Sequence, residues 1–164
     1  MQKGDNLNYR MNGTKCALTM KDLFVGKTVI VGIGNILHGD DGLGPYLVDR
    51  LKKRIVVPCI NAECSLDRYI GKIAREDPDT VVLVDAVHLN EKPGSVEILE
   101  PEELVDTRTS THDLTPSSTV EILKQVITGE VYLLGIQPAC VRLGAKISRR
   151  VKKAIRRLER RIVK

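Results

Sequence analysis

The sequence has few aromatic residues and few cysteines. Aromatics make up 3% of its 164 residues, with one Phe and no Trp. A protein that stacks nucleic-acid bases on aromatic rings would have little material for it. The four cysteines, Cys16, Cys59, Cys64 and Cys140, are too scattered for a disulfide scaffold, and the Cys-x-x-Cys spacing of redox motifs and zinc knuckles is absent. We therefore expect reduced thiols, as in the cytosol.

Long apolar runs are absent as well. No stretch reaches the roughly 18 apolar residues that a membrane-spanning helix needs. The first twenty residues are polar and lack the apolar centre of a signal peptide, so we expect a cytoplasmic protein in which residues 1–22 form a flexible N-terminal leader. With 42% hydrophobic and 29% charged residues, the remaining chain has an ordinary globular composition, and its length predicts one domain over residues 23–164.

Positive charge is concentrated at the C-terminal end of the chain. From Arg142 to Lys164 there are eleven Lys or Arg against the single Glu159, which leaves fifteen basic and twenty acidic residues elsewhere. Apolar residues recur at helical spacing in the same segment: Ile147, Val151, Ala154, Ile155, Leu158 and Ile162. The pattern predicts an amphipathic helix from Lys146 onward. Its cationic face is either simply solvated or a contact for an acidic partner, RNA or an anionic membrane surface.

Strand-like and helix-like segments alternate along the rest of the chain. Apolar and β-branched runs predict strands at 28–33, 54–60, 80–86, 95–99 and 130–136. Helical spacing predicts helices at 41–53, at 66–75 and from Pro116 to about 126. This alternation predicts an α/β fold, a single-domain three-layer α/β/α sandwich around a mostly parallel, twisted sheet of about five strands.

The loop after the first predicted strand lies where ligands bind in such sheets, beyond the carboxyl ends of the strands. It contains Gly32-Ile33-Gly34-Asn35 and then Gly39-Asp40-Asp41-Gly42. The opening is similar to a dinucleotide-binding loop, but Asp40 and Asp41 stand at the start of the next helix, where a pyrophosphate would sit. Two carboxylates there would repel phosphate and suit helix capping instead. The sequence therefore argues against a dinucleotide cofactor.

Three candidate site residues project from connections at this same edge of the predicted sheet. Asp41 follows the first strand, Asp85 ends strand 80–86, and His112 lies in the polar stretch before the Pro116 helix. Two carboxylates and one imidazole can bind a divalent ion such as Zn, Ni, Fe or Mn, and three protein ligands leave coordination positions open. Two further histidines are possible additional ligands or supporting donors: His38 and His88.

No conventional nucleophile motif accompanies these residues. The Gly-x-Ser-x-Gly elbow and the His-Glu-x-x-His helix are both absent. Asp41 and Asp85 could act as a general acid and a general base if they lie close together. An acid–base role for this pair is therefore a hypothesis.

Five motifs, in chain order, resemble those of the hydrogenase maturation endopeptidases. They are Gly32-Ile33-Gly34-Asn35 with Gly39-Asp40-Asp41-Gly42-Leu43-Gly44-Pro45, Val84-Asp85-Ala86, Thr111-His112-Asp113-Leu114, Leu134-Gly135-Ile136-Gln137-Pro138, and the segment from Gly144 to Ser148. The resemblance covers residues from about 25 to 160. Asp at position 41 and the Gly-Ile-Gln-Pro turn are most similar to the endopeptidases that serve hydrogenase-3-type, formate-hydrogenlyase-associated enzymes.

The resemblance implies an aspartyl-type endopeptidase that removes the C-terminal extension of the [NiFe]-hydrogenase large-subunit precursor after nickel insertion. Asp41, Asp85 and His112 would grip the nickel held in the substrate, so the metal would be a recognition mark and not a resident cofactor. A surrogate ion such as Zn or Cd could occupy the same ligands. Asp41 or Asp85 would assist the hydrolytic water. The expected partner is the precursor, with the protein a monomer, and neither nucleic acid nor a membrane span is expected.

Two other functions stay open at this stage. One is a nickel-dependent maturation chaperone that docks on the large subunit without cutting it. The other is a nucleic-acid or anionic-surface binding module built on the basic C-terminal helix. Binding by such a module would fall steeply with salt and would require the arginines of that helix.

Overall fold

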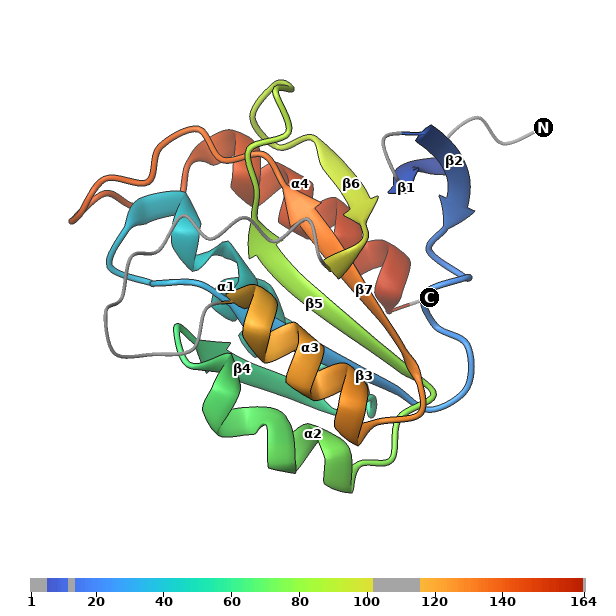
Figure 1. Ribbon diagram of the computed structural model, residues 1–164. Coiled ribbons are helices and arrows are strands. Elements are labelled where there is room, and N and C mark those ends of the chain that lie inside the picture. Colours follow the sequence, from blue (N-terminus) through green and yellow to red (C-terminus); the bar gives the residue numbers. More distant parts are fainter. Residues whose placement is uncertain (1–5, 12–13, 102–115, 164) are drawn as a thin grey trace.

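A seven-stranded sheet forms the middle of the protein, as seen in a computed structural model. The structure describes residues 6–11, 14–101 and 116–163, with the backbone alone for the residues up to 19 and for 116. The strands lie in the order β2-β1-β6-β7-β5-β3-β4 (Figure 1). β4, β3, β5 and β7 run parallel, and β6 is antiparallel to β7. The strands are Asn6–Met11 (β1), Thr14–Thr19 (β2), Thr28–Ile33 (β3), Cys59–Glu63 (β4), Thr80–Ala86 (β5), Val96–Leu99 (β6) and Glu130–Ile136 (β7).

Helices cover both faces of this sheet, which makes three layers. Figure 1 shows α2 and α3 in front of the sheet and α1 and α4 behind it. Two short 3-10 helices, η1 and η2, lead into α1 and α2. The helices are Gly39–Gly42 (η1), Leu43–Leu51 (α1), Leu66–Tyr69 (η2), Ile70–Arg75 (α2), Pro116–Val126 (α3) and Arg149–Ile162 (α4).

Each central strand contributes to two hydrophobic cores at once. In β5, Val82 and Val84 belong to the core under α1 and α4, whereas Val81 and Leu83 belong to the core under α2 and α3. Successive side chains of a strand point to opposite faces, so a strand covered on both faces is apolar over most of its length. The continuous apolar runs of β3, β5 and β7 therefore predicted these strands with their observed bounds, and the predicted α/β/α sandwich is confirmed.

The N-terminal segment differs from its prediction as a flexible leader over residues 1–22. β1 pairs antiparallel with β2 and parallel with β6, so the segment adds two strands to the five that the sequence predicts. Polar and apolar residues alternate in β1, and the sequence between the two strands, Asn12-Gly13, is typical of a hairpin. The physical reason for the addition is the edge of β6, whose backbone groups would otherwise lack a strand partner on that side.

Several element boundaries also differ from the prediction; the last helix, for example, begins at Arg149 and not at Lys146. β4 begins at Cys59 and not at residue 54, because the chain first returns from α1 across the surface, where Val56 is fully exposed. Pairing with β3 starts only where Cys59 lies opposite Ile30. The predicted helix 41–53 starts as the 3-10 turn η1 and becomes α-helical at Leu43.

The C-terminal helix α4 docks through the apolar stripe that its sequence predicts. Ser148 caps the helix, since its side chain accepts a hydrogen bond from the backbone N–H of Val151 (3.4 Å). Most of the basic residues of α4 are exposed on the opposite side. The buried apolar residues of the stripe are Val151, Ala154, Ile155 and Leu158.

One acidic residue of α4, Glu159, is buried between two arginines. It is 2% exposed and accepts hydrogen bonds from Arg50 (2.9 and 2.7 Å) and from Arg54 (2.9 Å). Burial alone would raise the pKa of Glu159, but the hydrogen bonds from Arg54 and Arg50 outweigh burial and hold the pKa below its usual value. The ion pairs therefore fasten α4 to α1 and to the turn that follows it.

No helix in the described ranges is long and apolar enough to cross a bilayer. Among the described cysteines, Cys59 and Cys140 carry free thiols. Burial raises the pKa of Cys59 to about 11, which keeps this thiol protonated and unreactive.

Replacing Glu159 by Gln is expected to lower the free energy of unfolding at pH 7 by about 1–2 kcal/mol, because two half-exposed arginines lose a charged acceptor. The pKa of Glu159 is depressed in the folded state. The stabilisation by its ion pairs is therefore present above the ordinary pKa of Glu, and it is lost as the pH falls through the folded-state pKa of Glu159. Denaturant titrations at pH 7 and in acid measure both effects. Asp49→Asn, in the exposed Lys52–Asp49 pair, is the control and is expected to change stability by less than about 0.5 kcal/mol. A Glu159→Gln variant as stable as the wild type at pH 7 would contradict this account.

Candidate functional site

The loop after β3 brings the two predicted carboxylate residues together at Gly34. This glycine has a φ of +137°, a conformation that other residues rarely adopt. A Cβ at Gly34 would strike the carbonyl oxygen of Asp41 and would lie 3.7 Å from Oδ1 of Asp85. A side chain here would therefore separate the backbone of Asp41 from the carboxylate of Asp85. Glycine at position 34 is therefore required both by the positive φ of the turn and by the close approach of Asp41 and Asp85.

The first turn of α1 lies directly on the ends of two strands. A Cβ at Gly44 would collide with the carbonyl oxygens of Ile33, at the end of β3, and Val84, in β5. A larger residue would hold the helix away from the sheet. The close approach carries η1, and with it Asp41, to the edge of the sheet where β5 ends.

Asp41 is half-buried, and its carboxylate is held in position by the loop before it. Oδ2 of Asp41 accepts a hydrogen bond from the backbone N–H of Asn35 (2.8 Å). The side chain of Asn35 in turn accepts a hydrogen bond from the backbone N–H of Leu37 (2.9 Å). The loop is therefore folded around Asp41, which fixes the direction of its carboxylate.

Asp85 lies near the end of β5, between β3 and β7, and is 5% exposed. Its Oδ1 accepts a hydrogen bond from the backbone N–H of Ala86 (2.8 Å). A carboxylate enclosed by protein interacts more strongly with a nearby cation than one in water does. Asp85 is therefore a candidate ligand for a cation at this edge of the sheet.

Asp40, the neighbour of Asp41, has a role other than the helix capping that the sequence predicts. It is completely buried, and its Oδ2 accepts hydrogen bonds from the backbone N–H groups of Ala139 (2.8 Å) and Cys140 (3.0 Å). Its Oδ1 accepts a hydrogen bond from the backbone N–H of Ser148 (2.6 Å). The carboxylate therefore joins η1 to the connection between β7 and α4. These partners are 99 to 108 residues away in the sequence, so no local pattern indicates them.

Gln137, in the motif at the end of β7, fixes the segment that follows Asp85. It is 7% exposed. Its Oε1 accepts a hydrogen bond from the backbone N–H of Leu89 (2.6 Å), and its Nε2 donates one to the carbonyl of Pro138 (3.1 Å). The sequence alone indicates no role for the Gln137 side chain beyond its place in the motif. The structure indicates that it positions the loop after β5.

The structure describes two of the three histidines that the sequence analysis names. His112, the third predicted ligand, lies outside the described residues, and its role stays a prediction. Nδ1 of His38 lies 3.3 Å from the carbonyl oxygen of Val141, and His88 is exposed. Across the part of the chain that the structure describes, no group of three or more His, Cys, Asp or Glu residues is arranged to hold a metal ion. Within that part, neither His38 nor His88 completes a metal site with the two carboxylates.

The two carboxylates support metal binding and proton transfer alike. Carboxylate oxygens combined with an imidazole nitrogen suit divalent ions of hard or borderline character. Two carboxylates in different surroundings can also divide the roles of general acid and general base. Asp85 is buried and Asp41 is half-buried, so their surroundings differ in the way that such a division needs.

Comparison with known proteins identifies the family of this chain. Residues 45–164 match the family model HycI, described as hydrogenase maturation protease. The hydrogenase 3 maturation protease of Escherichia coli is 30% identical over 139 residues, which is 82% of this chain and 87% of that protein. The chain therefore belongs to the hydrogenase maturation protease family and is a peptidase. The family resemblance drawn from five motifs is confirmed.

Solved structures from this family share the fold. The crystal structure of a [NiFe] hydrogenase maturation protease, HycI, from Thermococcus kodakarensis superimposes with a TM-score of 0.78 at 33% identity, covering 88% of this chain and 96% of that one. The solution structure of the endopeptidase HycI from Escherichia coli gives 0.72 at 26% identity, covering 84% and 90%. The fold derived from alternating strands and helices is thus that of known maturation proteases.

Asp40→Asn is expected to lower the free energy of unfolding by about 2–4 kcal/mol, because an amide NH2 would replace an acceptor that faces backbone N–H groups. Asp41→Asn keeps an oxygen for the N–H of Asn35 and is expected to cost less than about 1 kcal/mol. Denaturant unfolding of the two variants measures the difference. Equal losses would show that Asp40 has no special structural role.

Proposed function

We propose that this protease removes the C-terminal extension of the [NiFe]-hydrogenase large-subunit precursor after nickel has been inserted. Its relatives are named for the maturation of hydrogenases. The observation that carries the proposal is that the backbone of Asp41 and the carboxylate of Asp85 both border Gly34, on the carboxyl edge of the sheet. The proposed setting is the cytoplasm, with the precursor as partner and the protease as a monomer.

Asp41, Asp85 and His112 would bind the nickel that the precursor already holds. Three protein ligands leave coordination positions for the ligands that the substrate itself supplies. The metal would arrive with the substrate and leave with the product, so it marks a precursor that is ready for processing. Zn²⁺ or Cd²⁺ would bind the same donors when no precursor is present.

One of the two carboxylates would assist the water that cleaves the peptide bond. The carboxylate takes a proton from water as the water oxygen attacks the scissile carbonyl carbon. The C–N bond then breaks, and the proton passes to the nitrogen of the leaving amine. Asp41 is more exposed than Asp85, which favours Asp41 for contact with water and Asp85 for anchoring the cation.

Asp41→Asn, Asp85→Asn and His112→Gln are each expected to slow processing of the nickel-loaded precursor by about 100-fold or more, because each removes a proposed ligand or proton acceptor. Intact-mass spectrometry of the precursor measures loss of the C-terminal peptide, and circular dichroism checks the fold. His88→Gln is the matched control, because His88 is exposed and follows Asp85 by three residues. This control is expected to process the precursor normally.

Normal processing by all three site variants would overturn the assignment of these residues. A different result would point to the maturation chaperone: nickel-dependent binding of the precursor by the wild type, with no change in the precursor's mass.

A further inference from the structure

Among the described residues, seven large hydrophobic side chains are strongly exposed, and four of them lie at one place. Ile36 and Leu37 are in the loop after β3, with 60% and 61% of their surface exposed. Val141 and Leu143 are in the connection after β7, with 40% and 71% exposed. We call these four residues the rim patch. The other three, each in a separate part of the chain, are Val25, Val56 and Val126.

Hydrogen bonds hold the two segments of the rim patch against each other. The backbone N–H of Gly144 donates to the carbonyl of Leu37 (2.8 Å), and Nδ1 of His38 lies 3.3 Å from the carbonyl oxygen of Val141. The buried carboxylate of Asp40 binds the same connection at its beginning and end. The rim patch is therefore preformed on hydrogen-bonded backbone, and little ordering is needed before a partner binds.

The rim patch is continuous with the candidate site. Ile36 directly follows Asn35, whose backbone N–H holds the carboxylate of Asp41. A Cβ at Gly42 would lie 2.8 Å from Cα of Ile36, so the loop packs on the turn that carries Asp41. A polypeptide bound across the rim patch would therefore extend to the two carboxylates.

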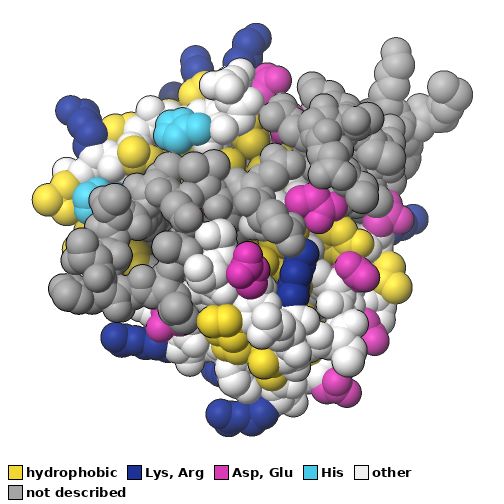
Figure 2. Space-filling model, in the orientation of Figure 1, with side chains coloured by type: hydrophobic (Ala, Val, Ile, Leu, Met, Phe, Trp, Pro, Cys, Tyr) yellow, Lys and Arg dark blue, Asp and Glu magenta, His cyan; other side chains and the backbone are white. Residues whose placement is uncertain are grey.

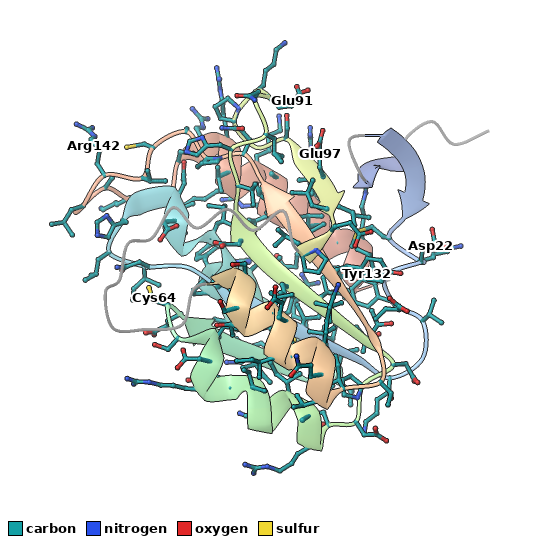
Figure 3. All side chains as sticks on the ribbon, in the orientation of Figure 1. Asp22, Cys64, Glu91, Glu97, Tyr132 and Arg142 are labelled. Atoms are coloured by element: carbon teal, nitrogen blue, oxygen red, sulfur yellow. The ribbon has the colours of Figure 1, made fainter. Side chains whose placement is uncertain are left out.

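The charged side chains within the two segments are basic. Arg142 and Lys146 are exposed, and the chain contains no Asp or Glu from residue 131 to residue 158. Arg142 donates a hydrogen bond from Nε to Sγ of Cys140 (3.4 Å), and this bond lowers the pKa of the thiol. Figure 3 shows Arg142 projecting at the edge of the molecule, and Figure 2 shows hydrophobic and basic side chains at the same edge.

A surface of this composition selects for a particular partner. Clustered exposed apolar side chains on a soluble protein commonly mark an interaction site, because covering them removes apolar area from water. Cations beside them favour a partner that carries carboxylates. The partner that fits is a protein segment with apolar side chains next to acidic ones.

We propose that the rim patch is the docking surface for such a segment of the precursor polypeptide. This inference rests on the proposed function and adds a second element of substrate selection. The carboxylates recognise the nickel, and the rim patch recognises the protein that carries it. Ile36, Leu37, Val141 and Leu143 supply apolar contact, while Arg142 and Lys146 set the sign of the partner's charge.

Binding and processing of nickel-loaded precursor by the full-length protein test the docking proposal. The double variant Leu37→Ser/Leu143→Ser removes apolar contacts, and Arg142→Glu reverses a charge. We expect each to raise the Kd and the KM for the precursor about tenfold or more, with kcat within about twofold of the wild type. Leu143→Ser alone is a milder variant for the case in which the double variant has a lowered Tm.

Matched controls lie at the opposite edge of the sheet, where the strands begin. Val56→Ser/Val126→Ser and Arg75→Glu make the same chemical changes at exposed positions there, and we expect their Kd values to stay within about twofold of the wild type. Unchanged Kd values in the rim-patch variants, or equal increases in the controls, would overturn the docking proposal even if the wild type processes precursor normally. A wild type that binds through the rim patch without cleaving would support docking and overturn the proposed cleavage. A wild type that neither binds nor cleaves would overturn both.

Discussion

The buried carboxylate of Asp40 is the contact on which the arrangement of the site depends. It accepts backbone hydrogen bonds from Ala139, Cys140 and Ser148, and so joins η1 to both ends of the connection between β7 and α4. A buried carboxylate is costly without such partners. The segment that carries Asp41 and the segment that carries half of the rim patch must therefore close together for either to be stable.

Two adjacent aspartates in the same turn thus have different physical tasks. Asp40 is enclosed and saturated by backbone donors, whereas Asp41 is half-buried and its carboxylate accepts a hydrogen bond from the backbone N–H of Asn35. Ser148, one partner of Asp40, also caps α4. The strongly basic helix is therefore fixed at its beginning to the same edge, and its apolar stripe and the Glu159 ion pairs fasten the rest of it to the body. Docking of α4 accounts for its apolar pattern. The exposed Lys and Arg side chains of α4 extend the positive charge next to the rim patch.

Sequence patterns predict those parts of this fold that depend on local burial. β3, β5 and β7 are covered on both faces, so they are apolar over most of their length, and this makes them recognisable. Asp41 and Asp85 could be predicted as neighbours because both follow parallel strands, whose carboxyl ends share one edge. The N-terminal hairpin was missed although β1 alternates and Asn12-Gly13 separates the two strands, because the segment is polar on average and β2 does not alternate.

Other features depend on partners that are distant in the sequence. The role of Asp40 and the burial of Glu159 each follow from residues about a hundred positions away. The start of β4 is set by its pairing with β3 and not by the composition of the residues before Pro58. The rim patch is formed by two short loops, each unremarkable alone, that hydrogen bonds bring together.

In the proposed function, the site acts on a precursor because the precursor holds nickel. The most direct test is intact-mass spectrometry of wild-type protein incubated with nickel-loaded precursor and, separately, with nickel-free precursor. This account predicts loss of a C-terminal peptide from the nickel-loaded precursor and an unchanged mass for the nickel-free one. Equal cleavage of the two would contradict the account, since the carboxylates would then have no metal to recognise.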